Sequence, residues 1–313
     1  MNKKSALVII MLFLFLTEIS GGWTENLKDY FADTAPSVGM SFLKIGIGAR
    51  AISLGGAYSS IVKDATAVFW NPGGVIYTEG LDASFSHLSL MEGVRYESVA
   101  ISTGDGNQGF GIGMGGVFYG NMELRDESPS EEPMGTFNAY SFVAKASYGH
   151  RLGNDIVAGV SVGAILEKIY VYSTHTYTID FALRYSPFII KPIIFSLHLN
   201  NLGPKVQYVD ETFRLPLTTK LGCSYSARRF NTDLTVITEI VKSLDTSLSG
   251  ATGLELGFSH ISLRFGYNYG DKNAGRWAGG LGVKYNFLSI DYSFAPYLMD
   301  LGAKQCVSLN LDF

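Results

Sequence analysis

The chain ends on a run in which apolar and polar residues alternate, Val307-Ser308-Leu309-Asn310-Leu311-Asp312-Phe313. A period of two places the four apolar residues on one face of a β-strand and the three polar residues on the other. The last residue, Phe313, is aromatic. An aromatic residue at the end of an alternating strand resembles the signal by which outer-membrane barrels are recognised for insertion.

The same alternation recurs along most of the chain. From Leu81 onward we count about fourteen such segments, with lengths near the 9–11 residues that a tilted membrane-spanning strand needs. They start near Leu81, Glu97, Gly109, Phe137, Asp155, Thr176, Pro192, Leu215, Asn231, Ser249, Ile261, Gly275, Phe287 and Gln305. Turn-like stretches separate them, for example Asp105-Gly106-Asn107, Gly153-Asn154-Asp155 and Asp271-Lys272-Asn273.

Aromatic residues gather near the ends of these segments, where a membrane barrel carries its interfacial girdle: Tyr267, Tyr269, Tyr292, Phe294 and Tyr297. An open sheet edge would leave N–H and C=O groups unpaired in hydrocarbon, so a membrane-spanning sheet must close. We therefore expect an all-β fold, an antiparallel transmembrane barrel over residues 81–313 in the bacterial outer membrane, in contact with its lipid. A soluble β-sandwich or propeller is the weaker alternative.

Composition excludes several classes of protein. Charged residues make up 17% of the chain, below the roughly 25% of ordinary globular domains. The net charge is −4, and no cluster of Lys and Arg suggests a nucleic-acid partner. The two cysteines, Cys223 and Cys306, fall on opposite faces of their predicted strands, so we expect free thiols. The spacing of Cys and His supports neither a metal site nor a cofactor.

The N-terminus has the pattern of a secretory signal peptide. Lys3 and Lys4 precede an apolar stretch from Ala6 to Leu16, and the small residues around Gly21 follow. The apolar stretch is shorter than the about 20 residues that a membrane-spanning helix needs. We expect residues 1–22 to be a signal peptide and no transmembrane helix to follow.

Residues 23–80 lack the alternating pattern. The stretch from Lys44 to Ser60 is rich in small residues, and Asp64 is placed to cap a short helix over Ala65 to Trp70. Asn71-Pro72 would end that helix. Small residues permit close packing, so this segment is expected to be a plug, with short helices, folded into the barrel lumen.

The motifs of this segment resemble the opening of PorV/PorQ-family proteins. They are Gly48-Ala49-Arg50-Ala51, Leu54-Gly55-Gly56-Ala57, Asp64-Ala65 and Trp70-Asn71-Pro72-Gly73-Gly74. Downstream the resemblance continues in Asn200-Asn201-Leu202-Gly203-Pro204-Lys205, Leu215-Pro216-Leu217, Arg264-Phe265-Gly266-Tyr267, Gly279-Gly280-Leu281-Gly282 and Ile290-Asp291-Tyr292-Ser293-Phe294. Gly74 departs from the family, where Ala is commoner.

This resemblance covers nearly all of the mature chain. It implies a fourteen-stranded barrel, similar to FadL fatty-acid transporters, with a luminal plug. It also implies exported cargo proteins and components of a type IX secretion system as partners. The fold carries over to this chain more readily than the function does.

No enzymatic site is predicted. Gly111-x-Gly113-x-x-Gly116 matches a dinucleotide fingerprint, but an acidic loop from Arg125 to Gly135 follows it rather than a helix. Those glycines fit better as the inner face of a strand that the plug approaches closely. The acidic loop is expected on the extracellular side. His198 beside Asn200 is the nearest approach to a hydrolase site, and a solvated or hydrogen-bonded luminal histidine fits it better.

Two groups of residues are candidates for a functional site. The plug or gate candidates are Arg50, Gly55, Gly56, Asp64, Trp70, Asn71, Pro72, Gly73 and Gly74. The luminal polar candidates are His198, Asn200, Arg264 and Asp291. The first functional hypothesis is a barrel that binds exported proteins and assists their secretion or surface attachment. The alternative is a FadL-like transporter of hydrophobic small molecules.

Overall fold

The computed structural model describes residues 38–125, 132–187, 192–269, 276–298 and 301–313. The expected signal peptide lies outside the described residues, as do most of the acidic loop after Arg125 and the turn Asp271-Lys272-Asn273. Among the described residues, no helix is long and apolar enough to cross a bilayer.

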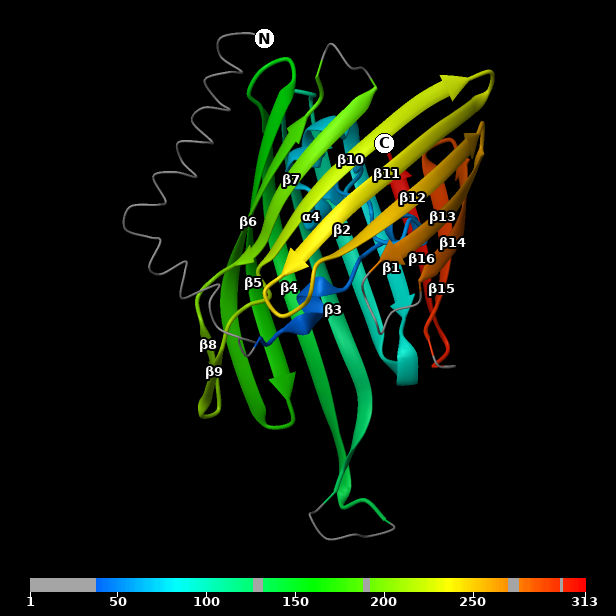
Figure 1. Ribbon diagram of the computed structural model, residues 1–313. Coiled ribbons are helices and arrows are strands. Elements are labelled where there is room, and N and C mark those ends of the chain that lie inside the picture. Colours follow the sequence, from blue (N-terminus) through cyan, green and yellow to red (C-terminus); the bar gives the residue numbers. More distant parts are fainter. Residues whose placement is uncertain (1–37, 126–131, 188–191, 270–275, 299–300) are drawn as a thin grey trace.

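Fourteen antiparallel strands close into one barrel (Figure 1). They are β1 Gly80–Ser89, β2 Arg95–Gly104, β3 Gln108–Leu124, β4 Gly135–Arg151, β5 Ile156–Ile169, β6 Tyr172–Tyr185, β7 Ile193–Leu202, β10 Thr218–Arg229, β11 Thr232–Ser243, β12 Ser249–Phe258, β13 Ile261–Tyr269, β14 Trp277–Tyr285, β15 Leu288–Pro296 and β16 Ala303–Asp312. Neighbours in the barrel follow the order of the chain, and β1 pairs with β16 to close it. The predicted fold is confirmed.

The C-terminal strand forms the closing seam. Val307 on β16 is 47% exposed on the outer face, whereas Ser308 beside it is 3% exposed toward the lumen. The seam runs to the last residue, since the amide of Phe313 donates to the carbonyl of Leu81 at 2.9 Å. The Phe313 ring stacks on Phe287 at 5.6 Å between centroids. The alternation in the sequence therefore predicted correctly which side chains of this strand face outward and which face the lumen.

The outer face of the barrel is apolar. On β3, Phe110 and Ile112 are 56% and 62% exposed, while Gly111 between them is buried. A closed barrel with such an outer face spans a membrane, because closure leaves no open sheet edge and the exposed side chains suit lipid. The protein is thus a barrel of the bacterial outer membrane.

The two ends of the barrel differ. Short turns at residues 105–107, 152–155, 230–231, 259–260 and 286–287 lie at the end that carries Phe313. Outer-membrane barrels keep such turns on the periplasmic side, so this is the periplasmic end, at the top of Figure 1. At the opposite, extracellular end, β3 and β4 continue past the barrel as a paired arm. The described ends of the acidic loop are at the tip of this arm.

A second, two-stranded sheet was not predicted. Its strands are β8 Val206–Tyr208 and β9 Glu211–Phe213, in the connection between β7 and β10. Three-residue strands are too short to show a period. The next barrel strand begins at Thr218 rather than near Leu215, since Pro216 has no N–H to donate to a ladder.

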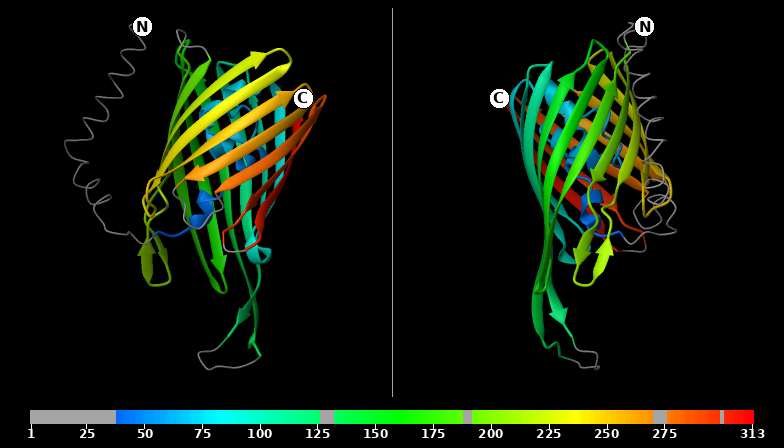
Figure 2. Two further views of the ribbon diagram at one scale, coloured as in Figure 1. Left: turned by 45° about the vertical axis from the view of Figure 1, so that its right-hand side comes forward. Right: turned by 90° about the vertical axis from the view of Figure 1, so that its left-hand side faces the viewer.

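Residues 38–79, which we call the plug, run from the extracellular mouth into the interior of the barrel, where Figure 2 shows blue segments behind the strands. The plug contains η1 Ser41–Lys44, α3 Ala49–Ser53, α4 Ala67–Trp70 and η2 Pro72–Tyr77. A further short helix, η3 Met91–Gly93, joins β1 to β2. The plug enters at the extracellular end, where the amide of Gly39 donates to the carbonyl of Arg214. It leads into β1 at the periplasmic end.

The predicted helix after Asp64 was placed two residues too early. The helix α4 begins at Ala67, and its N-cap residue Thr66 makes no side-chain cap. The Asp64 carboxylate instead accepts from the amide of Thr66 at 3.0 Å. Aspartate commonly bonds to the backbone two residues on, and this turn delays the helix. The predicted end at Asn71-Pro72 is confirmed.

Candidate functional site

The plug is held against the wall by backbone contacts at glycines. A Cβ atom on Gly266 of β13 would overlap the amide nitrogen of Gly55, and one on Gly159 of β5 would overlap that of Gly73. These two contacts lie at distant strands of the barrel. Glycine in a strand commonly marks such a close backbone approach.

The glycines of β3 make the same kind of contact. A Cβ atom on Gly111 would lie 2.6 Å from the Val68 side chain, and one on Gly113 would lie 2.7 Å from the Phe69 ring. The predicted glycine-lined inner face of this strand, with the plug packed on it, is confirmed. Close packing against the plug therefore explains Gly111 and Gly113, which belong to the sequence that matches a dinucleotide fingerprint.

Hydrogen bonds fix the interior of the plug. The Tyr58 hydroxyl donates to Asp64 at 2.6 Å, and the Trp70 indole donates to the carbonyl of Ile47 at 2.8 Å. Burial and the nearby Asp64 carboxylate raise the pKa of Tyr58 well above its usual range. The centre of the plug therefore holds two uncharged aromatic rings, Tyr58 and Trp70, which hydrogen bonds keep in place.

The turn Asn71-Pro72-Gly73-Gly74 is part of this framework. The Asn71 amide donates to the carbonyl of Ser59 at 2.8 Å, and its oxygen accepts from the amide of Gly73 at 2.9 Å. A Cβ atom on Gly74 would lie 2.9 Å from the carbonyl oxygen of Val62. The Ala that is commoner in the resembling family would therefore need a small shift here.

An ion-pair network ties the plug to the wall. Arg50 binds Glu255 of β12 through two nitrogens, at 2.8 and 2.7 Å. Arg264 of β13 binds both Glu255 and Asp291 of β15, each at 2.5 Å. Although burial acts to lower it, the pKa of Arg50 is raised because the Glu255 carboxylate favours the charged guanidinium. The structure thus brings Arg50, Arg264 and Asp291 together.

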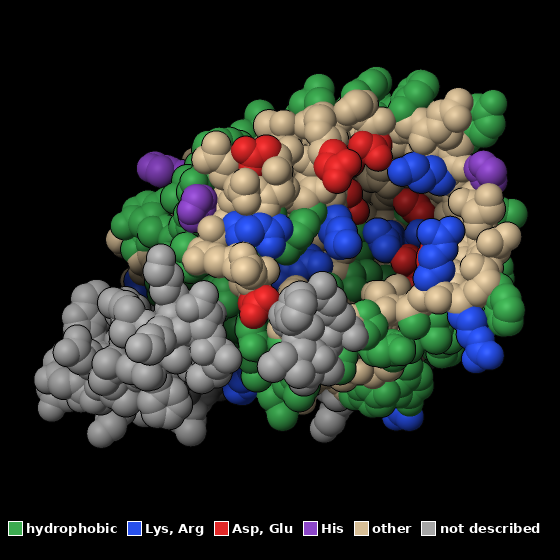
Figure 3. Space-filling view, turned by 90° about the horizontal axis from the view of Figure 1, so that it is seen from above, with side chains coloured by type: hydrophobic (Ala, Val, Ile, Leu, Met, Phe, Trp, Pro, Cys, Tyr) green, Lys and Arg blue, Asp and Glu red, His purple; other side chains and the backbone are tan. Residues whose placement is uncertain are grey.

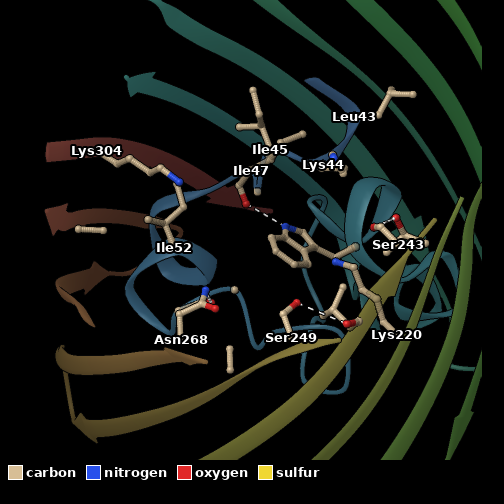
Figure 4. Close-up of a pocket in the computed structure, with 18 of the residues that line it drawn as sticks. Leu43, Lys44, Ile45, Ile47, Ile52, Lys220, Ser243, Ser249, Asn268 and Lys304 are labelled. Atoms are coloured by element: carbon tan, nitrogen blue, oxygen red, sulfur yellow. Dashed lines mark hydrogen bonds between the residues drawn. The ribbon is translucent and has the colours of Figure 1, made fainter. Parts of the chain in front are cut away.

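A cavity of about 550 Å³ lies between the plug and the wall, on the extracellular side (Figure 4). Its volume falls within the range of small-molecule sites, about 300–1,000 Å³. The plug contributes apolar side chains to it: Leu43, Ile45, Ile47, Ile52 and Phe69. Four of the residues predicted as site candidates also line it: Gly55, Gly56, Trp70 and Asn200.

Lysines give the cavity a positive border. Lys220 and Lys304 reach toward it from different strands, as Figure 4 shows. The Lys220 ammonium lies 4.4 Å from the centre of the Trp70 ring and 3.7 Å from Glu239. Lys44 pairs with Asp245 at 2.5 Å. These cations stand beside apolar plug residues, so the cavity suits a hydrophobic molecule with an anionic or electron-rich group.

The remaining luminal candidate, His198, does not line the cavity. It lies on the inner face of β7, opposite Lys220 of β10, and is fully buried. Neither ring nitrogen has a hydrogen-bond partner among the described residues. The expectation of a solvated or hydrogen-bonded histidine stays a prediction. No described serine pairs with this ring to make a hydrolase site.

The wall beside the cavity is incompletely paired. The ladder between β14 and β15 begins at Gly279 and Phe294. The next two residues of each strand toward the extracellular end, Trp277-Ala278 and Ala295-Pro296, have no partner across this boundary, and all four line the cavity. Proline cannot donate to a ladder, which accounts for the break.

Sequence reasoning missed most of the cavity. Its lysines and its unpaired wall come from strands far apart in the chain, and each is unremarkable in its own segment. The two cysteines were predicted correctly, with Cys223 exposed, Cys306 buried and both thiols free. Within the described ranges, no group of His, Cys, Asp and Glu could hold a metal ion.

Comparison with known proteins identifies the fold. No protein-family model matches the chain, and no curated protein matches it. The toluene transporter TbuX of Ralstonia pickettii is 11% identical with a TM-score of 0.58, covering 86% of this chain and 98% of that one. The monoaromatic hydrocarbon channel CymD is 10% identical with a TM-score of 0.60, covering 88% and 99%. A FadL homologue of Pseudomonas aeruginosa is 10% identical with a TM-score of 0.55, covering 90% and 100%.

Identities this low establish the fold alone. The chain has the fold of FadL-type barrels. Of the proteins named, TbuX is a toluene transporter and CymD a monoaromatic hydrocarbon channel. The more specific resemblance to PorV/PorQ proteins has no support from a family model or a curated relative.

Proposed function

We propose that the protein conducts hydrophobic small molecules across the outer membrane. The observation that carries this proposal is the cavity of about 550 Å³ with its apolar plug residues and its border of lysines. Toluene transporters and a monoaromatic hydrocarbon channel share the fold. The lysines extend the expected substrates from neutral aromatics to hydrophobic carboxylates, whose head group a Lys ammonium would bind.

The route out of the cavity runs through the wall in this proposal. Backbone contacts at Gly55 and Gly73 hold the plug against opposite parts of the barrel, so a straight path to the periplasm would have to pass the plug. The unpaired stretch between β14 and β15 lies beside the cavity and is the exit that we propose. A hydrophobic molecule would pass there directly into lipid, where its transfer from water is favourable.

The test is uptake by intact cells of a host that lacks its own channel for hydrophobic compounds. Cells that carry the full chain should take up labelled toluene and decanoate several times faster than cells with an empty vector. Labelled glucose serves as the control, because a hydrophilic sugar should enter both cells equally. Equal uptake of toluene and decanoate in both cells, with folded protein in the membrane, would refute the proposal.

A second candidate function is the binding of exported proteins, which the PorV/PorQ resemblance implies. The arm of β3 and β4 favours it, because paired strands that extend beyond the barrel offer a surface outside the membrane. Asn121 pairs with Asn138 across the arm. Replacing residues 122–137 by Asn-Gly would join this pair by a two-residue turn and leave the cavity intact. Loss of surface-attached cargo with unchanged toluene uptake would support this second function, and unchanged cargo would exclude it.

A further inference from the structure

Three cationic side chains surround one aromatic ring at the periplasmic end. The Arg184 guanidinium carbon lies 4.4 Å from the centre of the Tyr77 ring, that of Arg151 lies 5.6 Å from it, and the Lys63 ammonium lies 5.9 Å from it. Lys63 and Tyr77 belong to the plug, whereas Arg151 is the last residue of β4 and Arg184 the last but one of β6. We call these four residues the Tyr77 cluster.

No carboxylate neutralises the Tyr77 cluster among the described residues. Arg184 donates to the carbonyl of Val62 at 3.3 Å, and Arg151 donates to the carbonyl of Gly106 at 2.6 Å. Neither makes an ion pair with a described Asp or Glu. Surface cations in other parts of this barrel do pair, as Lys284 does with Asp312 at 3.3 Å. The Tyr77 cluster therefore differs from such pairs in having no described Asp or Glu bound to its cations.

Arg184 is the member that most needs a partner. It is 2% exposed, and its Nε atom is buried without a hydrogen bond to any described residue. A buried charge is strongly unfavourable unless it is paired and hydrogen-bonded. The face of Tyr77 offsets part of this cost, because an aromatic ring attracts a cation that lies over its face.

The positive charges of the surrounding arginines also affect Lys63, the lysine of the cluster. Burial, together with the charges of Arg184 and Arg50, lowers the pKa of Lys63. Bringing a bound anion between these cations would remove their repulsion and favour the charged ammonium. The cluster thus has both the hydrogen-bond donors and the excess charge that an anion site requires.

The Tyr77 cluster is separate from the cavity, and none of its residues lines the cavity. Arg151 contacts Gly106 in the turn between β2 and β3, which belongs to the periplasmic end. Figure 3 looks onto this end and shows Lys and Arg side chains gathered over the mouth of the barrel, beside several Asp and Glu side chains. A solute from the periplasm would meet this face first.

We propose that Lys63, Arg151 and Arg184 form a binding site for an oxyanion, a carboxylate or phosphate group, presented from the periplasm. Guanidinium groups present a planar fork of donors that matches two oxygens of such a group, and an ammonium adds a point charge. Because the donors come from both plug and wall, the bound anion bridges the two. The site does not depend on the proposed transport of hydrophobic molecules.

Isothermal titration of the purified full chain in non-ionic detergent tests the site. The probes are inorganic phosphate and acetate, a carboxylate without the apolar chain that the cavity would bind, each added to wild type, Lys63→Gln and Arg184→Gln. Lys284→Gln is the matched control, since it removes a cation at the same end that already has its own carboxylate. Heat-modifiable migration on gels establishes that each variant keeps its barrel.

Saturable binding is expected in wild type and in Lys284→Gln. It should weaken about tenfold or more in Lys63→Gln and Arg184→Gln, as loss of a charge-assisted hydrogen bond predicts. Phosphate binding alone would identify a phosphate ligand, acetate alone a carboxylate, and displacement of one by the other a general oxyanion site. Lack of binding by both probes, or binding that the two variants leave unchanged, would overturn the proposal.

Discussion

The amide nitrogen of Gly55 in the plug lies against Gly266 of β13, so closely that a Cβ atom on Gly266 would overlap it. Gly55 also adopts a positive φ of 70°, which glycine accepts without strain. This contact fixes the plug to the wall next to the cavity. It explains why a strand of the barrel carries a glycine where a polar residue would otherwise face the lumen.

Substitution of Gly266 should therefore destabilise the docked plug. We expect Gly266→Ala to lower the free energy of unfolding by about 1–3 kcal/mol, the usual cost of overpacking. Guanidinium unfolding in lipid vesicles measures it. Gly279→Ala on the neighbouring strand is the control, because the nearest atom to its added Cβ would be 3.8 Å away. Equal unfolding midpoints for the two variants would show that the close contact of Gly266 with Gly55 leaves room for a methyl group.

The ion-pair network predicts a second effect on stability. Glu255 is the shared partner of Arg50 and Arg264, so Glu255→Gln leaves two partly buried guanidinium groups short of an anion. We expect a loss of about 3 kcal/mol, typical of removing one partner from a buried pair. The exposed pair of Glu97 with His87 offers the comparison.

Glu97→Gln should change the free energy of unfolding by less than about 1 kcal/mol, because exposed pairs contribute little. Both variants are followed by the same guanidinium titration in vesicles. If Glu255→Gln unfolds at the wild-type midpoint, the network does not hold the plug to the wall.

Most of the barrel could be predicted from the sequence, because alternation reports directly on which side chains meet lipid. The last strand shows this best, since Val307 and Ser308 lie on opposite faces as expected. The sequence could not show the cavity. Its lining depends on which distant residues meet, and neither Lys220 nor Lys304 carries a local signal of that meeting. The Tyr77 cluster was missed for the same reason.

The unpaired wall predicts that uptake depends on movement between β14 and β15. In a Cys223→Ser background, Ala278→Cys and Ala295→Cys would place two thiols across the break, where the register of Gly279 with Phe294 would continue. Joining them with a short bismaleimide should reduce toluene uptake several-fold. The free double variant, before treatment, should retain wild-type uptake.

The matched control joins Leu281→Cys to Tyr292→Cys, residues that already pair across the same strands. Treatment of that variant should leave uptake unchanged, because the ladder is closed there in any case. Equal uptake before and after treatment of the Ala278/Ala295 variant, with the cross-link shown by mass spectrometry, would place the route elsewhere.

The most direct measurement of the central claim is toluene uptake by cells in which the cavity itself is filled. Ser249 lines the cavity, whereas its neighbour Leu248 is 64% exposed and does not line it. Ser249→Trp should therefore lower the initial uptake rate several-fold, and Leu248→Trp should keep the wild-type rate at equal amounts of folded barrel. If both variants take up toluene at the wild-type rate, the cavity is not the path and the proposed function is wrong.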